Sequence, residues 1–137
     1  MIKLETVGML DVAKINPVLT SASNVTNYDF IKTNDILYLV CNTIVGDNAY
    51  REDVVIPAGE YLNGYQVDAF VGQKLVVDGK HISGTQYSAL AVGNILTVNS
   101  SGKLAVAENA PASGVYFKIT EKTTLTEPAV KVLVCVA

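Results

Sequence analysis

The side chains that could act in catalysis are few in this chain and lie far apart in the sequence. His81 is the sole histidine, and with Cys41 and Asp78 it would supply a nucleophile, a base and an orienting acid. The spacing gives no support to such a set. Cys41 ends the apolar run ILYLVC, and His81 follows a turn signal, where a residue at a hairpin edge is the simpler interpretation. We therefore expect that the protein is not an enzyme and has no catalytic residues.

Metal and cofactor sites have equally little support. Zinc sites need several cysteine or histidine ligands, and the chain has two cysteines and one histidine, all widely separated. The acidic group Asp47, Glu52 and Asp53 lacks the residue order of an EF-hand calcium loop, so a solvated loop is the simpler interpretation. Neither nucleotide motif, GxxxxGKS/T or GxGxxG, occurs. No metal and no cofactor are expected.

Tyrosines are the remaining candidates for binding chemistry, because carbohydrate-binding β-modules stack sugars on exposed aromatic rings. Tyr50, Tyr61 and Tyr65 lie close together in the sequence, although the chain has no tryptophan. Hydrophobic pairing across strands explains Tyr61 and Tyr65 without a ligand. A host-surface or glycan-binding module is kept as the alternative function, and it predicts that at least one of these three rings is exposed.

The composition describes a small, apolar and weakly charged domain. Of 137 residues, 50% are hydrophobic and 17% are charged, and the mean hydropathy is +0.32. Such a chain has enough apolar material for one core and leaves some of it at the surface. We expect a homo-oligomer, or a subunit docked on another protein.

The charge pattern argues against nucleic acid and membrane partners. The net charge is −3, the basic residues are scattered singly, and Arg51 is the sole arginine, so no basic patch for nucleic acid is predicted. The longest uncharged stretch, residues 81–102, is broken by glycines and polar residues and does not fit a membrane helix. Glu5 and Asp11 interrupt the start of the chain, where a signal peptide needs an apolar core.

Short runs of β-branched residues between frequent turn signals predict an all-β fold, a small β-sandwich or barrel built of hairpins with at most short helical turns. Asn63-Gly64 and Asp78-Gly79 fit two-residue type I′ hairpin loops, which need positive φ. Residues 99–102 predict a longer hairpin loop, and residues 46–48 and 57–59 predict turns. Helical turns are predicted over residues 9–14 and 86–91.

Two further patterns concern the strands themselves. Residues 129–137, AVKVLVCVA, form a strand pattern that is apolar on both faces, which places this strand in the middle of a sandwich or barrel, or under a partner molecule. Residues 71–77, VGQKLVV, are echoed by residues 92–98, VGNILTV, and each copy predicts a strand that opens after a glycine and reverses at a glycine turn.

Cys41 and Cys135 each lie in an apolar strand run, so buried free thiols are the simpler interpretation of both. A disulfide bond between them requires adjacent strands and stays open.

The N-terminal residues 1–30 lack a sustained period and predict an extended arm, ahead of a β domain over residues 31–137, within a single folding unit. The predicted partner contacts are residues without an evident role inside the chain. They are Ile15, Val18 and Leu19 in the arm, and Tyr50 and Arg51 at a loop tip.

The second half of the chain resembles the decoration proteins, also called head auxiliary or cement proteins, that bind the outside of tailed-bacteriophage capsids. The resemblance lies in VGQKLVVDGK (71–80), VGNILTVNSSGKLAVAENA (92–110), YFKITEKTTL (116–125) and PAVKVLVCVA (128–137). These segments are similar to the glycine-opened hairpin, glycine-lysine turn and closing valine-rich strand of such proteins. Residues 11–25 and 56–70 also resemble segments of phage structural proteins.

The resemblance implies a non-enzymatic cement that binds the major capsid protein and further copies of itself, often as a homotrimer. Such a protein would be assembled in the cytoplasm of the bacterial host and would stabilise the shell from the capsid exterior. The N-terminal segment would complete a strand edge of the capsid by β-strand addition.

Overall fold

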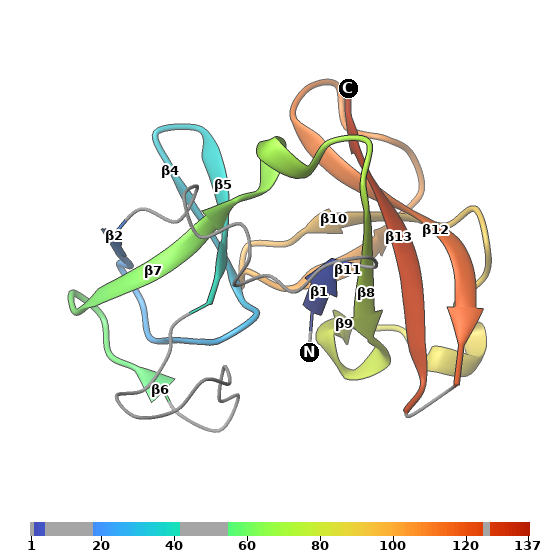
Figure 1. Cartoon of the computed structure of the whole chain (residues 1–137), viewed down its shortest axis with the longest axis horizontal. Helices are drawn as coiled ribbons and strands as arrows, with labels where there is room; N and C mark the ends of the chain where they lie inside the picture. The colour runs from blue at the N-terminus through green and yellow to red at the C-terminus, as the bar shows by residue number, and fades with distance from the viewer. Residues whose placement is uncertain (1, 5–17, 42–54, 125–126) are drawn as a thin grey trace.

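The structure is a computed structural model that describes residues 2–4, 18–41, 55–124 and 127–137. These residues form curled β-sheets joined by turns and short 3-10 helices (Figure 1), which confirms the predicted all-β class. The strands are β1 (Ile2–Leu4), β2 (Val18–Thr20), β3 (Val25–Thr26), β4 (Phe30–Thr33), β5 (Ile36–Val40), β6 (Val55–Ile56), β7 (Tyr61–Gln66), β8 (Lys74–Asp78), β9 (Ile82–Ser83), β10 (Ile95–Val98), β11 (Leu104–Ala107), β12 (Val115–Thr123) and β13 (Ala129–Val136). The 3-10 helices are η2 (Val67–Phe70), η3 (Gly79–His81) and η4 (Tyr87–Ala89).

The largest sheet contains seven strands in the order β1-β8-β13-β12-β10-β11-β9. Its strand β13 lies between β8 and β12 (Figure 1), so both of its edges are paired. Val130, Val132 and Val134 on its inner face are buried, whereas Leu133 on the outer face is half-buried. The inner face therefore packs into the main core, and the outer face is only partly covered.

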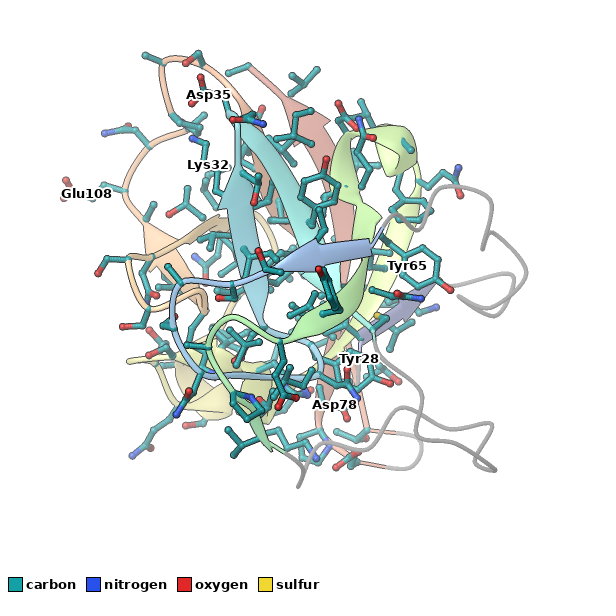
Figure 2. The ribbon with its side chains drawn as sticks, turned by 90° about the vertical axis from the view of Figure 1, so that its left-hand side faces the viewer. Tyr28, Lys32, Asp35, Tyr65, Asp78 and Glu108 are labelled. Carbon is teal, nitrogen blue, oxygen red and sulfur yellow. The ribbon has the colours of Figure 1, made fainter. Side chains whose placement is uncertain are left out.

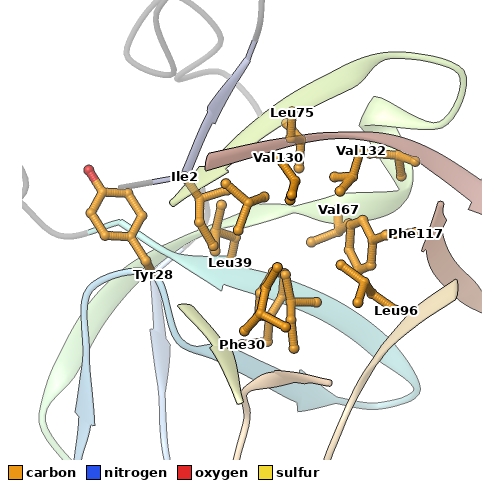
Figure 3. Close-up of a cluster of buried hydrophobic side chains, with 14 of the residues drawn as sticks. Ile2, Tyr28, Phe30, Leu39, Val67, Leu75, Leu96, Phe117, Val130 and Val132 are labelled. Atoms are coloured by element: carbon orange, nitrogen blue, oxygen red, sulfur yellow. The ribbon is translucent and has the colours of Figure 1, made fainter. Parts of the chain in front are cut away.

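The main core lies between this sheet and the strands of the first half of the chain. Phe117, Leu96 and Val132 from the large sheet meet Phe30 and Leu39 from β4 and β5 (Figure 3). The rings of Phe30 and Phe117 are 5.7 Å apart between centroids and tilted by 58°, a favourable geometry for an aromatic pair. Apolar burial of this extent is the main stabilising contribution to the fold.

The first half forms a four-stranded sheet in the order β2-β7-β5-β4 and a two-stranded pair β3-β6. Strand β7 lies between two cores, because Leu62 belongs to a small cluster and Tyr65 to the main core. Part of the segment 1–30 is paired with the rest of the chain. Strand β1 pairs with β8 and β2 pairs with β7, both antiparallel.

The prediction of a hairpin turn at Asn63-Gly64 is wrong, because both residues lie inside strand β7. The physical reason is close packing. A Cβ atom at Gly64 would lie 3.1 Å from Leu19 Cδ1 and 3.1 Å from Tyr38 Cβ, so glycine here allows neighbouring strands to approach. Gly64 leaves room for the neighbouring strands, and it does not have the positive φ that a type I′ turn needs.

The prediction of a hairpin turn at Asp78-Gly79 is also wrong. Gly79 begins η3 without a positive φ, and the following strand β9 pairs with β11 in a parallel arrangement. The Gly79 N–H donates to the carbonyl of Pro128 at 2.8 Å, and a Cβ atom at Gly79 would lie 3.2 Å from the Tyr87 ring. Contacts distant in sequence therefore direct the chain away from a reversal.

Other predicted turns are confirmed. The loop of residues 99–102 joins β10 to β11, where Gly102 has φ of 76° and Asn99 Oδ1 accepts the N–H of Ser101 at 3.0 Å. Residues 57–59 form a turn, and η4 lies within the helical turn predicted over residues 86–91. The turn predicted over 46–48 and the helical turn over 9–14 fall outside the described residues.

The repeated pattern corresponds to a repeated turn. Val71 and Gly72 are the central residues of a type II turn, with φ of −55° at Val71 and 88° at Gly72, and the Gln73 N–H donates to the Phe70 carbonyl at 2.9 Å. Gly93 occupies the equivalent position in the second copy with φ of 95°. Each turn opens a strand as predicted, but of the two only the second strand, β10, continues into a hairpin, because the first ends at η3.

Candidate interaction surface

The structure describes two of the predicted partner contacts. Val18 and Leu19 lie in β2, opposite Asn63 and Leu62 of β7, and the half-buried Leu19 side chain packs on the small core. Leu19 thus has a role within its own chain. Ile15, Tyr50 and Arg51 lie outside the described residues.

Tyr61 directly follows a turn that hydrogen bonds from other parts of the chain hold in place. The Gly59 N–H donates to the carbonyl of Ser21 at 2.9 Å, and the Ala58 N–H donates to Asn24 Oδ1 at 2.9 Å. Tyr61 begins β7 directly after this turn, and 80% of it is exposed. A large amphipathic ring on a fixed backbone is a favourable contact for a partner, because little conformational entropy is lost on binding.

Tyr65, four residues further along β7, has the opposite environment. It is fully buried, and its ring lies 6.2 Å from that of Phe70 between centroids. Of the two tyrosines that the structure describes among the three glycan candidates, Tyr61 alone is exposed. The sequence pattern alone did not distinguish the exposed Tyr61 from the buried Tyr65.

Exposed valines form a second feature that sequence reasoning missed. Val71 and Val92 occupy the same position in the two type II turns and are 39% and 64% exposed. Val136 is 57% exposed and lies near Val71, because the N–H of Gly72 donates to the carbonyl of Val134 at 2.9 Å. The signal was present in the repeated Val-Gly pairs, since a glycine at positive φ places the residue before it at the first central position of a type II turn.

The residues considered for catalysis each have other partners. The ring of His81 is 5.5 Å from that of Tyr28, Asp78 forms a side-chain hydrogen bond with Glu127, and Cys41 lies in the main core. In the described part of the chain, no three His, Cys, Asp or Glu side chains gather where they could hold a metal ion.

Glu127 borders an open depression of about 470 Å³, lined by Gly79, Lys80, Ile82, Thr85, Gln86, Tyr87, Glu127 and Pro128. The hydrogen bond that the Glu127 carboxyl donates to the Asp78 carboxylate, together with the negative charge of Asp78, raises the pKa of Glu127 above its ordinary value. The Tyr87 ring is already covered by Lys122, whose Nζ lies 4.4 Å from the ring centroid and donates to the carbonyls of Tyr87 and Leu90. These contacts of Lys122 hold η4 against β12.

The two cysteines are free, and their environments differ. Burial raises the pKa of the Cys41 thiol far above its ordinary value of about 8.5, whereas Cys135 is half-buried on the outer face of β13. The prediction of a buried thiol is therefore wrong for Cys135. We expect a thiol reagent to modify Cys135 in the folded protein and Cys41 only after unfolding, as measured by mass spectrometry of the digested protein.

The raised pKa of the Cys41 thiol also predicts that the stability of the protein depends on pH. Because the pKa of Cys41 is raised by folding, the unfolded chain releases this proton first as the pH rises. The contribution of Cys41 to stability is therefore constant below about pH 8.5 and falls above it. In Cys41→Ala this part of the alkaline decline should disappear, while Cys135→Ala should retain it. An identical decline in both variants would contradict the assignment.

No helix within the described residues has the length and apolar character needed to span a membrane. Comparison with known proteins found no matching family model, no matching curated protein and no matching solved structure.

Proposed function

We propose that this protein is a non-enzymatic structural protein of a tailed-bacteriophage virion that binds the outer capsid surface and stabilises the shell. It acts as a homotrimer or another homo-oligomer and contacts the major capsid protein. It is assembled in the cytoplasm of the bacterial host and remains on the capsid exterior.

The observation that carries this proposal is the display of apolar side chains on opposite sides of the molecule. The turn between β6 and β7, which Val55 and Tyr61 flank, lies at the left of Figure 1. The C-terminal end of β13, which carries Val136 and is bonded to the turn of Val71 and Gly72, lies at the top. A cement must contact more than one neighbour, and two separate contact regions meet that requirement.

Stabilisation of the shell follows from mass action. A protein that binds the assembled shell, and not its dissociated subunits, stabilises the shell by about 2.7 kcal/mol per site when its free concentration is one hundred times Kd. Attachment through two regions raises the apparent affinity further, because the second contact forms within one complex.

The proposal predicts that phage particles made without this protein lose their DNA at a lower temperature than complete particles. Adding the purified protein should restore the release temperature, and the protein should co-sediment with the particles. Release is measured with a DNA-binding dye during heating. Unchanged release and no co-sedimentation would contradict the proposed function.

The alternative, a host-surface or glycan-binding module of a phage particle, is favoured by the 80% exposure of Tyr61. Tyr61→Ala separates the two functions. For a glycan-binding module, this variant should lose binding on a glycan array while still attaching to particles. For a cement, no glycan should bind either the wild type or the variant.

A further inference from the structure

The outer face of the large sheet carries lysines set among apolar side chains. One continuous row crosses five strands in the order Lys74, Leu133, Lys118, Ile95 and Ala107, as given by the pairing of β8, β13, β12, β10 and β11. A second row contains Val76, Lys131 and Glu121, and a third contains Cys135 and Tyr116. We call these residues the lysine face.

The lysine face is positively charged, although the whole chain has a net charge of −3. Lys74 and Lys118 are exposed on either side of the half-buried Leu133, two strand spacings or roughly 10 Å apart. Neither forms an ion pair with another described residue. The carboxylate of Glu121, in the second row, is already paired with Lys131, at 3.1 Å between Oε2 and Nζ.

We propose that the lysine face is the surface that docks on the capsid, and that its partner is a protein surface with apolar side chains bordered by carboxylates. This inference rests on the proposed function and adds the lysine face to the two contact regions described there. Leu133, Ile95, Val76 and Tyr116 supply the apolar contact, and Lys74 and Lys118 pair with carboxylates of the shell.

Charge complementarity favours this partner over a second copy of the chain. A symmetric contact between two lysine faces would bring Lys74 and Lys118 close to the same lysines of the other copy, and this repulsion disfavours binding. Nucleic acid is a poorer fit, because the lysines of the lysine face are separated by aliphatic side chains and the face contains no arginine.

The test measures co-sedimentation of wild-type protein, Lys118→Glu, Lys74→Glu and Lys32→Glu with particles that lack the protein. Lys32 is the matched control, because it is also an exposed lysine on a strand but lies on β4, which is in front of the large sheet in Figure 2. Each change on the lysine face should weaken binding at least tenfold, and Lys32→Glu should bind like the wild type. Binding of the wild type should also weaken as the salt concentration rises.

The outcomes separate this inference from the proposed function. Binding of all four proteins with equal affinity would overturn the proposal that the lysine face docks on the capsid, and would leave the proposed function intact. Failure of the wild type to bind would overturn both. A changed oligomeric mass of Lys118→Glu in solution, with unchanged attachment to particles, would show that the face joins copies of this chain and would also overturn the inference.

Discussion

Gly102→Ala is expected to destabilise the protein by roughly 3–5 kcal/mol, from the strain of a left-handed backbone and from a collision. Gly102 has φ of 76°, and a Cβ atom there would lie 2.5 Å from the carbonyl oxygen of Phe30. Relief of this collision requires the turn to move and weakens the bond that the Phe30 N–H donates to the Gly102 carbonyl at 2.8 Å. The free energy of unfolding in urea measures the effect.

The loss is large because Gly102 lies where the turn after β10 meets the turn before β4. Lys103, the next residue, forms an ion pair with the buried Asp29, and Asp29 Oδ2 also accepts the N–H of Thr26 at 2.9 Å. A shift at Gly102 would disturb this pair as well. Buried charges that lose their partners are strongly destabilising.

Gly93→Ala is the matched control. Gly93 has φ of 95°, but nothing lies within 4 Å of a Cβ atom placed there. This variant has the backbone strain without the collision and should lose about 1–2 kcal/mol. Equal losses in the two variants would show that strain alone accounts for the effect and that the contact between the two turns adds nothing.

Phe117→Ala should destabilise the protein by about 3–5 kcal/mol, the usual range for removing a buried aromatic ring. Phe117 is fully buried at the centre of the main core and packs against Phe30 (Figure 3). Its removal leaves a cavity that the flanking strands β10 and β13 cannot close without breaking their pairing. Chemical denaturation gives the loss, and the two-state character should be checked with two probes.

The adjacent Tyr116→Ala provides the comparison, because neighbouring residues of a strand point to opposite faces. Tyr116 is half-buried on the lysine face, so its removal should cost about 1 kcal/mol or less. It should instead weaken attachment to particles. A loss of stability as large as that of Phe117→Ala would mean that the outer face is part of the core.

Several features follow from short-range patterns and were predicted. The loop of residues 99–102 needs only a glycine at positive φ and an asparagine that bonds to the backbone beyond it, and both are read from neighbouring residues. The burial of one face of β13 follows from the valines on alternate residues, because such an apolar face must be covered. The predicted all-β class rests on the same alternation.

The features that were not predicted depend on residues far apart in the sequence. Asn63-Gly64 has the composition of a turn, but Leu19 and Tyr38 pack across Gly64 and keep it in a strand. Asp78-Gly79 is directed into η3 by Tyr87 and Pro128. In both cases a local preference of about 1 kcal/mol or less is outweighed by tertiary contacts.

The candidate surfaces were likewise predictable only in part from the sequence. The alternation of residues along β13 is enough to place Leu133 opposite the core, but only the order β8-β13-β12 brings Lys74 and Lys118 to either side of it. Tyr61 and Tyr65 are chemically identical, yet one is 80% exposed and the other 0%. Backbone preferences and periodicity act between residues near in sequence, whereas exposure and the neighbours of a side chain arise when distant strands pair, so tertiary structure alone decided them.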